Sequence, residues 1–187
     1  TKCIGLVVET RPEEVTANNL SFLRAMGCTK IQIGLQSNDD EILKKNKRGH
    51  LAEDNKSACD LLRQFGFKIH GHVMVNLWGA TPSKDYDDFL SFFNEPRLMP
   101  DELKVYPCML VEDTELHTAY ERKEWEPYPQ EVLENLLKKM LLSVPQWCRI
   151  SRMIRDFSKD DIVAGNKKAN LRQHLQKELE SQHQPVK

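Results

Sequence analysis

The sequence predicts an α/β fold, specifically a partial TIM-type (β/α) barrel with about five βα units. Apolar, β-rich segments begin near residues 2, 30, 68, 102 and 147, and every interval between them contains at least one helical segment. Strands that alternate with helices in this way usually pair in parallel. The chain has 187 residues, whereas a complete eight-unit barrel needs about 250, so we expect only part of a barrel.

Capping and breaking residues place the helices between these strands. Arg11-Pro12 is expected to begin the first helix, because proline and acidic residues favour a first turn, and Gly27 to end it. Residues 37–40 are expected to cap a short helix that ends at Lys45, and Ser83 to cap the helix after the third strand. A charged helix is expected over residues 170–182. The clearest helix covers residues 129–143, with apolar residues at helical spacing: Val132, Leu133, Leu136, Leu137, Met140 and Leu141.

Composition narrows the classes of function. A net charge of −1 gives no sign of a general nucleic-acid binder, so any contact with nucleic acid must come from a local patch or from another part of the protein. No segment approaches the run of roughly 20 apolar residues that crosses a bilayer, and no membrane contact is expected. The strand that follows directly after Thr1 indicates a start in the middle of a domain.

The cysteines are scattered rather than paired. They are Cys3, Cys28, Cys59, Cys108 and Cys148, and no two form a C-x-x-C motif. The sequence therefore predicts no cysteine-based zinc or iron–sulfur site within the chain, and no metal ligand is assigned. Such cysteines fit a reduced, cytoplasmic protein.

One face of successive strands is repeatedly polar. Side chains alternate across a strand, so Ile31, Ile33 and Leu35 share one face of the second strand and oppose the polar face. Polar residues would not all be placed in a dry core, which indicates a wet or ligand-filled lumen. Parallel barrels bind ligands at the carboxyl ends of their strands. The residues expected around this mouth are Glu9, Gln36, Met74, Asn76, Tyr106 and Arg155.

Some of these polar residues have structural alternatives. Glu9 could form an ion pair with Arg11, and Lys104 could extend to solvent or pair with Glu9. His70 and His72 have the spacing of two metal ligands on a strand, but the sequence offers no third ligand.

Basic residues concentrate near the fifth strand. Phosphate or RNA backbone contact is one interpretation, and a solvated edge neutralised by Asp156, Asp160 and Asp161 is the other. The residues concerned are Arg149, Arg152, Arg155, Lys167, Lys168 and Arg172.

An ordered series of short strings resembles the radical-SAM domain of the Elongator catalytic subunit family, in particular the prokaryotic-type enzymes that modify tRNA uridine-34. The series runs over nearly the whole chain, and its order and spacing carry the specificity. One departure is Val75, where the family tends to have proline. The strings cover residues 9–12 (ETRP), 33–37 (IGLQS), 46–50 (NKRGH), 76–82 (NLWGATP), 103–107 (LKVYP), 152–156 (RMIRD), 164–166 (AGN) and 170–172 (NLR).

The resemblance implies an enzyme that uses S-adenosylmethionine, a 4Fe-4S cluster whose ligands lie upstream of this chain, and acetyl-CoA bound mainly by a downstream acetyltransferase domain. A 5′-deoxyadenosyl radical would abstract hydrogen from an acetyl group, and the carbon radical would add to C5 of the wobble uridine. Residues 1–165 would form the latter half of the barrel, and residues 166–187 a helix leading to the missing domain. The chain alone would be inactive. The implied partner is tRNA, and a homodimer or accessory subunits are left open.

Roles carried over from the family fall on matched positions. Glu9 suits the amino group of S-adenosylmethionine, Gln36 and Ser37 its carboxylate or ribose, and Asn76 and Leu77 its adenine. As catalytic residues, Lys104 and Tyr106 would hold the acetyl donor or uracil. The basic residues near the fifth strand, Arg152 and Arg155 first among them, suit phosphate or carboxylate groups.

Two alternatives compete with this interpretation. One is a radical-SAM enzyme with another substrate, such as a porphyrin-oxidising or methylthiotransferase-type enzyme. The other is a non-catalytic RNA-docking or assembly module, against which Glu9, Gln36 and Lys104 argue.

Overall fold

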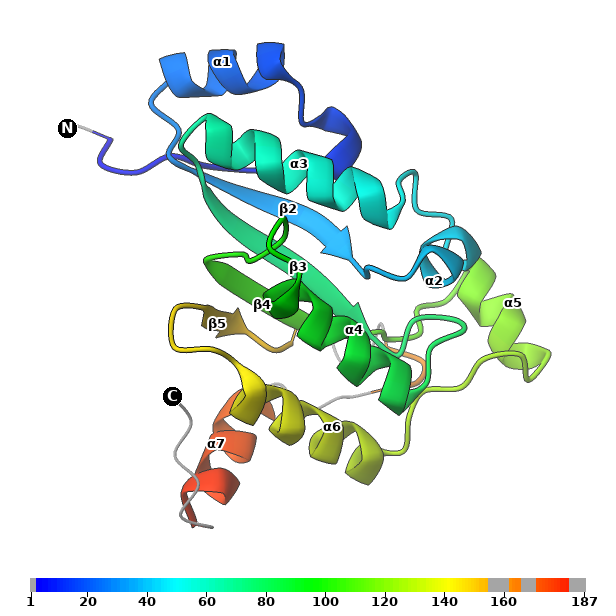
Figure 1. Cartoon of the computed structure of the whole chain (residues 1–187). Coiled ribbons are helices and arrows are strands. Elements are labelled where there is room, and N and C mark those ends of the chain that lie inside the picture. Colours follow the sequence, from blue (N-terminus) through cyan, green and yellow to red (C-terminus); the bar gives the residue numbers. More distant parts are fainter. Residues whose placement is uncertain (1–2, 155–161, 166–170, 182–187) are drawn as a thin grey trace.

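The strands form one parallel sheet. The computed structural model describes residues 3–154, 162–165 and 171–181. Within them the sheet has five strands in the order β1-β2-β3-β4-β5, which confirms the predicted fold class (Figure 1). Every neighbouring pair is parallel. The strands are β1 (Val7–Thr10), β2 (Lys30–Gln36), β3 (Lys68–Val75), β4 (Glu102–Pro107) and β5 (Arg149–Arg152).

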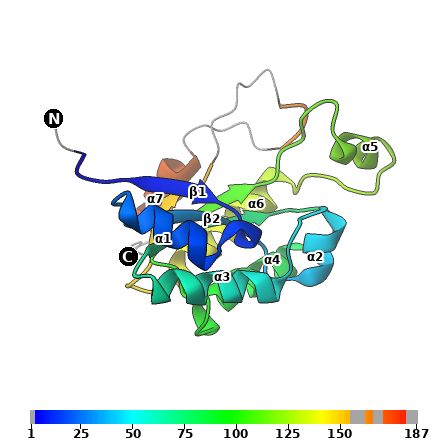
Figure 2. The same ribbon diagram turned by 90° about the horizontal axis from the view of Figure 1, so that it is seen from above.

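The helices connect consecutive strands. In Figure 2, α1, α3 and α4 lie on one side of the sheet, and α2 and α5 lie near the carboxyl ends of the strands in Figure 1. None of the helices in the described ranges is long and apolar enough to span a membrane. The helical elements are η1 (Pro12–Glu14, a 3₁₀ turn), α1 (Ala17–Ala25), α2 (Asp40–Lys45), α3 (Ala52–Gln64), α4 (Pro82–Asn94), α5 (Glu115–Glu121), α6 (Gln130–Ser143) and α7 (Leu171–Ser181).

The apolar face of the sheet packs against the helices. Ile31, Ile33 and Leu103 are fully buried there and share one core with Leu137 of α6 and Leu175 of α7. At roughly 1.5–3 kcal/mol for each fully buried large apolar side chain, this face supplies most of the burial energy of the sheet. Its burial leaves the opposite, polar face of the strands available for a site.

Local structure corrects two predictions about the helices. The helix expected to run from Arg11-Pro12 to Gly27 is interrupted: a 3₁₀ turn ends at Glu14, and α1 begins after Thr16, whose side chain accepts a hydrogen bond from the Asn19 amide. Helix α4 is capped by Thr81, not by Ser83, because Pro82 takes its first position.

The outer strands are also shorter than expected. Strand β1 begins at Val7 rather than near residue 2, and β5 covers only Arg149–Arg152. The division expected at residues 165/166 borders residues outside the described ranges, and it stays a prediction. Helix α7 nonetheless shares the main core with α6 through Leu171, Leu175 and Leu179.

Candidate active site

Parallel register aligns polar side chains in a row across the whole sheet. Glu9 pairs with Gln32, Gln32 with His70, His70 with Glu102, and Glu102 with Arg149. Because residues in register point to the same side of a sheet, one face carries charged and hydrogen-bonding groups from all five strands. The predicted polar face is therefore present.

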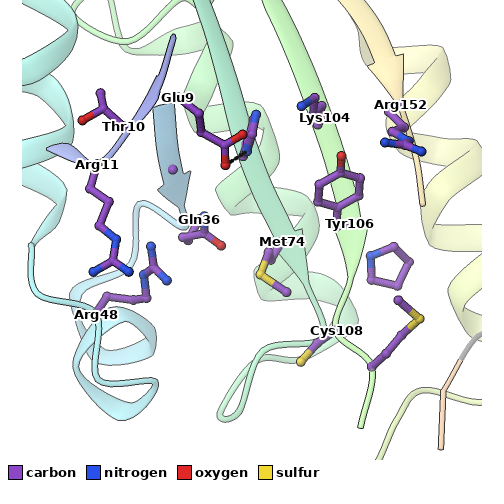
Figure 3. A pocket seen from close by; sticks show the side chains of 14 residues that line it. Glu9, Thr10, Arg11, Gln36, Arg48, Met74, Lys104, Tyr106, Cys108 and Arg152 are labelled. Carbon is purple, nitrogen blue, oxygen red and sulfur yellow. Dashed lines mark ion pairs between the residues drawn. The ribbon is translucent and has the colours of Figure 1, made fainter. Parts of the chain in front are cut away.

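A cavity of about 570 Å³ opens on this face toward the carboxyl ends of the strands. Figure 3 shows Glu9, Arg11, Gln36 and Arg48 at one end of it, and Lys104, Tyr106 and Arg152 at the other. Its lining residues are Glu9, Thr10, Arg11, Gly34, Gln36, Arg48, His72, Met74, Lys104, Tyr106, Pro107, Cys108, Met109 and Arg152. The structure thus brings five of the predicted site residues together: Glu9, Gln36, Lys104, Tyr106 and Arg152.

Gln32 joins Lys104 and His72 through hydrogen bonds, and His72 in turn lies close to Glu9 at the other end of the cavity. Lys104 Nζ donates to Gln32 Oε1 at 2.6 Å, and His72 Nε2 lies 3.2 Å from the same oxygen. His72 Nδ1 is 3.7 Å from Glu9 Oε1, while Tyr106 packs edge-on against the His72 ring. Burial lowers the pKa of Lys104, Glu9 opposes this, and Arg152 adds to it. Lys104 thus pairs with Gln32 and not with Glu9.

Arg48 was not among the predicted site residues. Burial and the neighbouring Arg11 lower the pKa of its guanidinium, and Nε is buried without a hydrogen-bond partner. Within the described ranges, no carboxylate lies within salt-bridge distance of Arg48, whereas Arg11 Nη1 lies 3.9 Å from Glu13 Oε1. Two clustered arginines, one of them with a buried nitrogen that has no hydrogen-bond partner, have the chemistry to accept an anion. Arg48 lies within the string NKRGH that the sequence analysis singled out, but the string alone does not predict that its side chain lines the cavity.

Gly34 forms part of the cavity floor beside these arginines. A Cβ at Gly34 would lie 3.1 Å from Gln36 Nε2 and 3.5 Å from Arg48 Nη2. A side chain there would therefore fill the space between the two polar groups. Glycine at this position leaves that space open beside both polar groups.

The ends of β2 and β3 are fixed by two carboxylates of α4. Gln36 and Asn76 both have left-handed backbone conformations, with φ of 65° and 61°. Asp88 accepts hydrogen bonds from Ser37 Oγ at 2.7 Å and from the Asn38 amide at 2.8 Å. Asp85 accepts them from the Asn76 amide at 2.7 Å and from Tyr128 Oη at 2.8 Å. Burial raises the pKa of both carboxyl groups to about 6.

Three predicted cofactor-binding residues do not line the cavity. Ser37 is bonded to Asp88, Asn76 is buried with its carbonyl accepting from Trp125 Nε1, and Leu77 is buried in a small cluster with Trp125. Their contacts with a cofactor stay predictions. In the structure, the hydrogen bonds of Ser37 and Asn76 set the direction of the chain after β2 and after β3.

The predicted basic residues separate into distinct places. Arg152 lines the cavity, Arg149 is exposed beside Glu102 in the sheet, and Arg172 Nη1 donates to the Ser151 carbonyl at 3.1 Å. Their contact with tRNA stays a prediction. Arg155, Lys167 and Lys168 lie outside the described residues.

Among the described residues, His70 and His72 do not come together with a third potential metal ligand. His70 Nε2 lies 2.6 Å from Ser151 Oγ and Nδ1 lies 3.7 Å from Glu102 Oε2, while His72 faces Gln32 and Glu9. Burial lowers the pKa of His70 to about 4, although Glu102 opposes this. Metal-binding residue types meet elsewhere, at Glu134, His174 and Glu178 on α6 and α7. There Lys138 Nζ already lies 2.5 Å from Glu178.

Comparison with protein families decides the classification. Residues 3–92 match the radical SAM superfamily, and residues 100–181 match the radical SAM C-terminal domain. The chain belongs to the radical SAM superfamily. An archaeal Elp3 structure from Methanocaldococcus infernus with an N-terminal deletion matches with a TM-score of 0.93 at 35% identity, over 99% of this chain and 43% of that one.

Three curated proteins are similar to nearly the whole of this chain. The tRNA uridine(34) acetyltransferase of Dehalococcoides mccartyi is 38% identical over 98% of this chain and 40% of its own length. The tRNA uridine(34) acetyltransferase of Methanocaldococcus infernus is 36% identical over 96% of this chain and 34% of its own length. Elongator complex protein 3 of Homo sapiens is 32% identical over 92% of this chain and 32% of its own length. The chain thus spans about a third to two fifths of the length of these relatives. Coproporphyrinogen III oxidase from Escherichia coli, at 21% identity and a TM-score of 0.58, shares the fold.

Membership of the superfamily implies S-adenosylmethionine and a 4Fe-4S cluster, and the chain fits the first of these. The cavity volume, the opposite charges of Glu9 and Arg48 in its lining, and the buried Arg48 Nε without a hydrogen-bond partner suit an amino-acid nucleoside. Four of the five cysteines are buried, and among the described residues no three cysteines come together as cluster ligands. The ligands of the cluster are therefore not found in this part of the protein.

Proposed function

We propose that this chain forms the cofactor- and substrate-facing part of a radical-SAM enzyme that modifies C5 of the wobble uridine of tRNA with a carboxymethyl-type group. One observation carries the proposal: a single cavity has one end lined by the opposite charges of Glu9 and Arg48 and a donor-rich end at Lys104 and Tyr106. The names of the relatives, tRNA uridine(34) acetyltransferase and Elongator complex protein 3, support the substrate.

The end lined by Glu9 and Arg48 suits the methionine part of S-adenosylmethionine. Glu9 offers a carboxylate to its ammonium group, and Arg48 offers a guanidinium to its carboxylate. Gln36 lies between them and can donate to the carboxylate or to the ribose. When bound with the cluster, S-adenosylmethionine supplies a 5′-deoxyadenosyl radical that abstracts hydrogen.

The donor-rich end suits the group that reacts with this radical. Lys104 is held by Gln32 and Tyr106 stands beside it, so both can donate to the carbonyl oxygens of uracil or of an acetyl group. Arg152 adds a positive charge on the same side for a phosphate or carboxylate. Acetyl-CoA as the acetyl donor, bound mainly by a separate acetyltransferase domain, is part of the proposal.

The tRNA would approach this mouth from the side of β5. A net charge of −1 favours a local contact by residues such as Arg152 over a general basic surface. We propose that residues 166–187 lead toward the acetyltransferase domain and that the enzyme acts in the cytoplasm. A homodimer or accessory subunits would complete the tRNA contact.

The test separates the two ends of the cavity in the full-length protein, reconstituted with its cluster under anaerobic conditions. Hydrogen bonds to charged groups contribute roughly 1.5–3 kcal/mol, which corresponds to tenfold or more in an equilibrium constant. We therefore expect Arg48→Met to raise KM for S-adenosylmethionine at least about tenfold. Lys104→Met should lower tRNA modification at least about tenfold while 5′-deoxyadenosine formation falls much less.

Lys177→Met, at an exposed position of α7, is the matched control and should resemble wild type in both assays. If Lys104→Met and Arg48→Met also match wild type, the proposed site is wrong. If 5′-deoxyadenosine forms but no tRNA is modified by the wild type, the substrate is wrong while the cofactor end stands.

A further inference from the structure

Strand β5 contains an irregularity next to the cavity. Leu103 pairs with Ile150, but the next residue of β4, Lys104, pairs with Arg152 and not with Ser151. Ser151 is thus an extra residue in β5, as in a β-bulge, where two residues of one strand oppose one of its neighbour.

The extra residue decides where Arg152 points. In a regular strand side chains alternate, so Arg152 would share the face of Ile150, which is buried against the helices. In the structure Ser151 Oγ contacts His70 on the polar face, and Arg152 lines the cavity beside Lys104 (Figure 3). Both consecutive side chains therefore lie on the polar side of the sheet.

Three contacts hold Ser151 in this position. Its Oγ donates to the Leu103 carbonyl at 3.2 Å and lies 2.6 Å from His70 Nε2. Because a hydroxyl has one proton, donation to Leu103 leaves the His70 N–H to donate to Ser151. From α7, Arg172 Nη1 donates to the Ser151 carbonyl at 3.1 Å.

The position of His70 is itself fixed. Its Nδ1 lies 3.7 Å from Glu102 Oε2, and Lys30 Nζ donates to Glu102 Oε1 at 2.6 Å. His70 is only 5% exposed, so its ring has little freedom to move away from Ser151. The bulge is therefore supported by β2, β3, β4 and α7 together.

We propose that Ser151 and Arg172 are positioning residues that place the Arg152 guanidinium in the cavity. Neither side chain lines the cavity, and both act through the backbone at residues 151 and 152. The inference rests on the proposed function in one respect, since it takes Arg152 to contact an anionic group of the substrate.

A double-mutant cycle in the full-length enzyme tests this coupling. We expect Arg152→Ala to lower kcat/KM for tRNA at least about tenfold and Ser151→Ala to lower it about threefold to tenfold. If Ser151 acts through Arg152, adding Ser151→Ala to Arg152→Ala costs nothing further. Ser151→Thr, which keeps the hydroxyl, should restore most of the activity, and Ser181→Ala at an exposed position of α7 is the matched control. Additive losses, or no loss from Ser151→Ala alone, would overturn the proposal.

A second measurement does not depend on activity. In an Arg152→Cys variant, the introduced thiol should react faster with an anionic than with a cationic methanethiosulfonate, because Lys104 lies beside it. Adding Ser151→Ala or Arg172→Met should reduce this preference severalfold, as measured by peptide mass spectrometry. An unchanged preference would overturn the positioning role. If the preference falls but Arg152→Ala keeps full activity, the positioning role holds and the assignment of Arg152 to the substrate fails.

Discussion

Replacing Asp85 with asparagine tests how α4 supports the end of β3. Asp85 is 5% exposed and accepts hydrogen bonds from the Asn76 amide and from Tyr128 Oη. Asparagine has the same shape, and its Oδ1 can accept both bonds. The substitution therefore removes a buried charge while it keeps the geometry of the loop.

The magnitude follows from the pKa of this carboxyl group. Burial raises it from 3.8 to about 6, although the two hydrogen bonds oppose the shift. The folded protein therefore holds the Asp85 proton more tightly than the unfolded chain does, and protonation of Asp85 stabilises the fold. This stabilisation is complete below pH 3.8, the pKa in the unfolded chain, and is lost as the pH rises through about 6. At 1.36 kcal/mol per pKa unit the whole effect is about 3 kcal/mol, of which about 1.4 kcal/mol falls between pH 5 and pH 8.

Urea unfolding at pH 5 and pH 8 measures this effect. The free energy of unfolding of Asp85→Asn, minus that of the wild type, should be about 1.4 kcal/mol larger at pH 8 than at pH 5, so the variant is relatively more stable at pH 8. Asp87→Asn removes the same charge from an exposed position of α4 and should show no such difference between the two pH values. A relative stability of Asp85→Asn that is equal at both pH values, or greater at pH 5, would refute the reasoning.

Further substitutions distinguish the cavity from the core. Gly34→Ala places a Cβ 3.1 Å from the flexible end of Gln36, so KM for S-adenosylmethionine should rise several-fold while the urea midpoint changes little. Gly71→Ala places a Cβ 2.8 Å from Leu103 Cδ2 within the core, and the free energy of unfolding should fall by about 1–3 kcal/mol. Leu137→Ala removes a fully buried side chain of α6, and the free energy of unfolding should fall by about 2–5 kcal/mol in urea unfolding.

The central strands were predictable because two signals coincide in them. Residues 30–36 and 102–107 alternate apolar and polar side chains, and turn residues bound them. The first helix was less predictable because two starting signals compete: Pro12 favours a first turn, but Thr16 caps the longer helix that packs Leu20 into the core.

The site could be predicted only as far as side chains alternate. Alternation places Glu9, Gln36 and Lys104 on one face, and the structure places them around one cavity. Gln36 itself has a left-handed backbone conformation that turns the chain, so alternation no longer predicts the direction of Ser37. Arg48 reaches the cavity from the loop after α2, and the path of that loop depends on tertiary contacts that periodicity does not contain.

The bulge in β5 is invisible to the same reasoning. An extra residue leaves no mark in a four-residue strand, because Arg149–Arg152 reads equally well in either register. Its position is decided by His70 and Arg172, which come from distant parts of the chain.

The two-faced sheet has a consequence for protein engineering. Across β2, β3 and β4 the odd-numbered side chains, such as Ile33, Val73 and Val105, face the helices, while even-numbered ones, such as Gln36, His72 and Lys104, face the cavity. A library that randomises only even positions would therefore vary chemistry while sparing the apolar packing that keeps the domain folded. Deep mutational scanning should show this odd–even division directly, with growth at reduced temperature rescuing damage at odd positions alone.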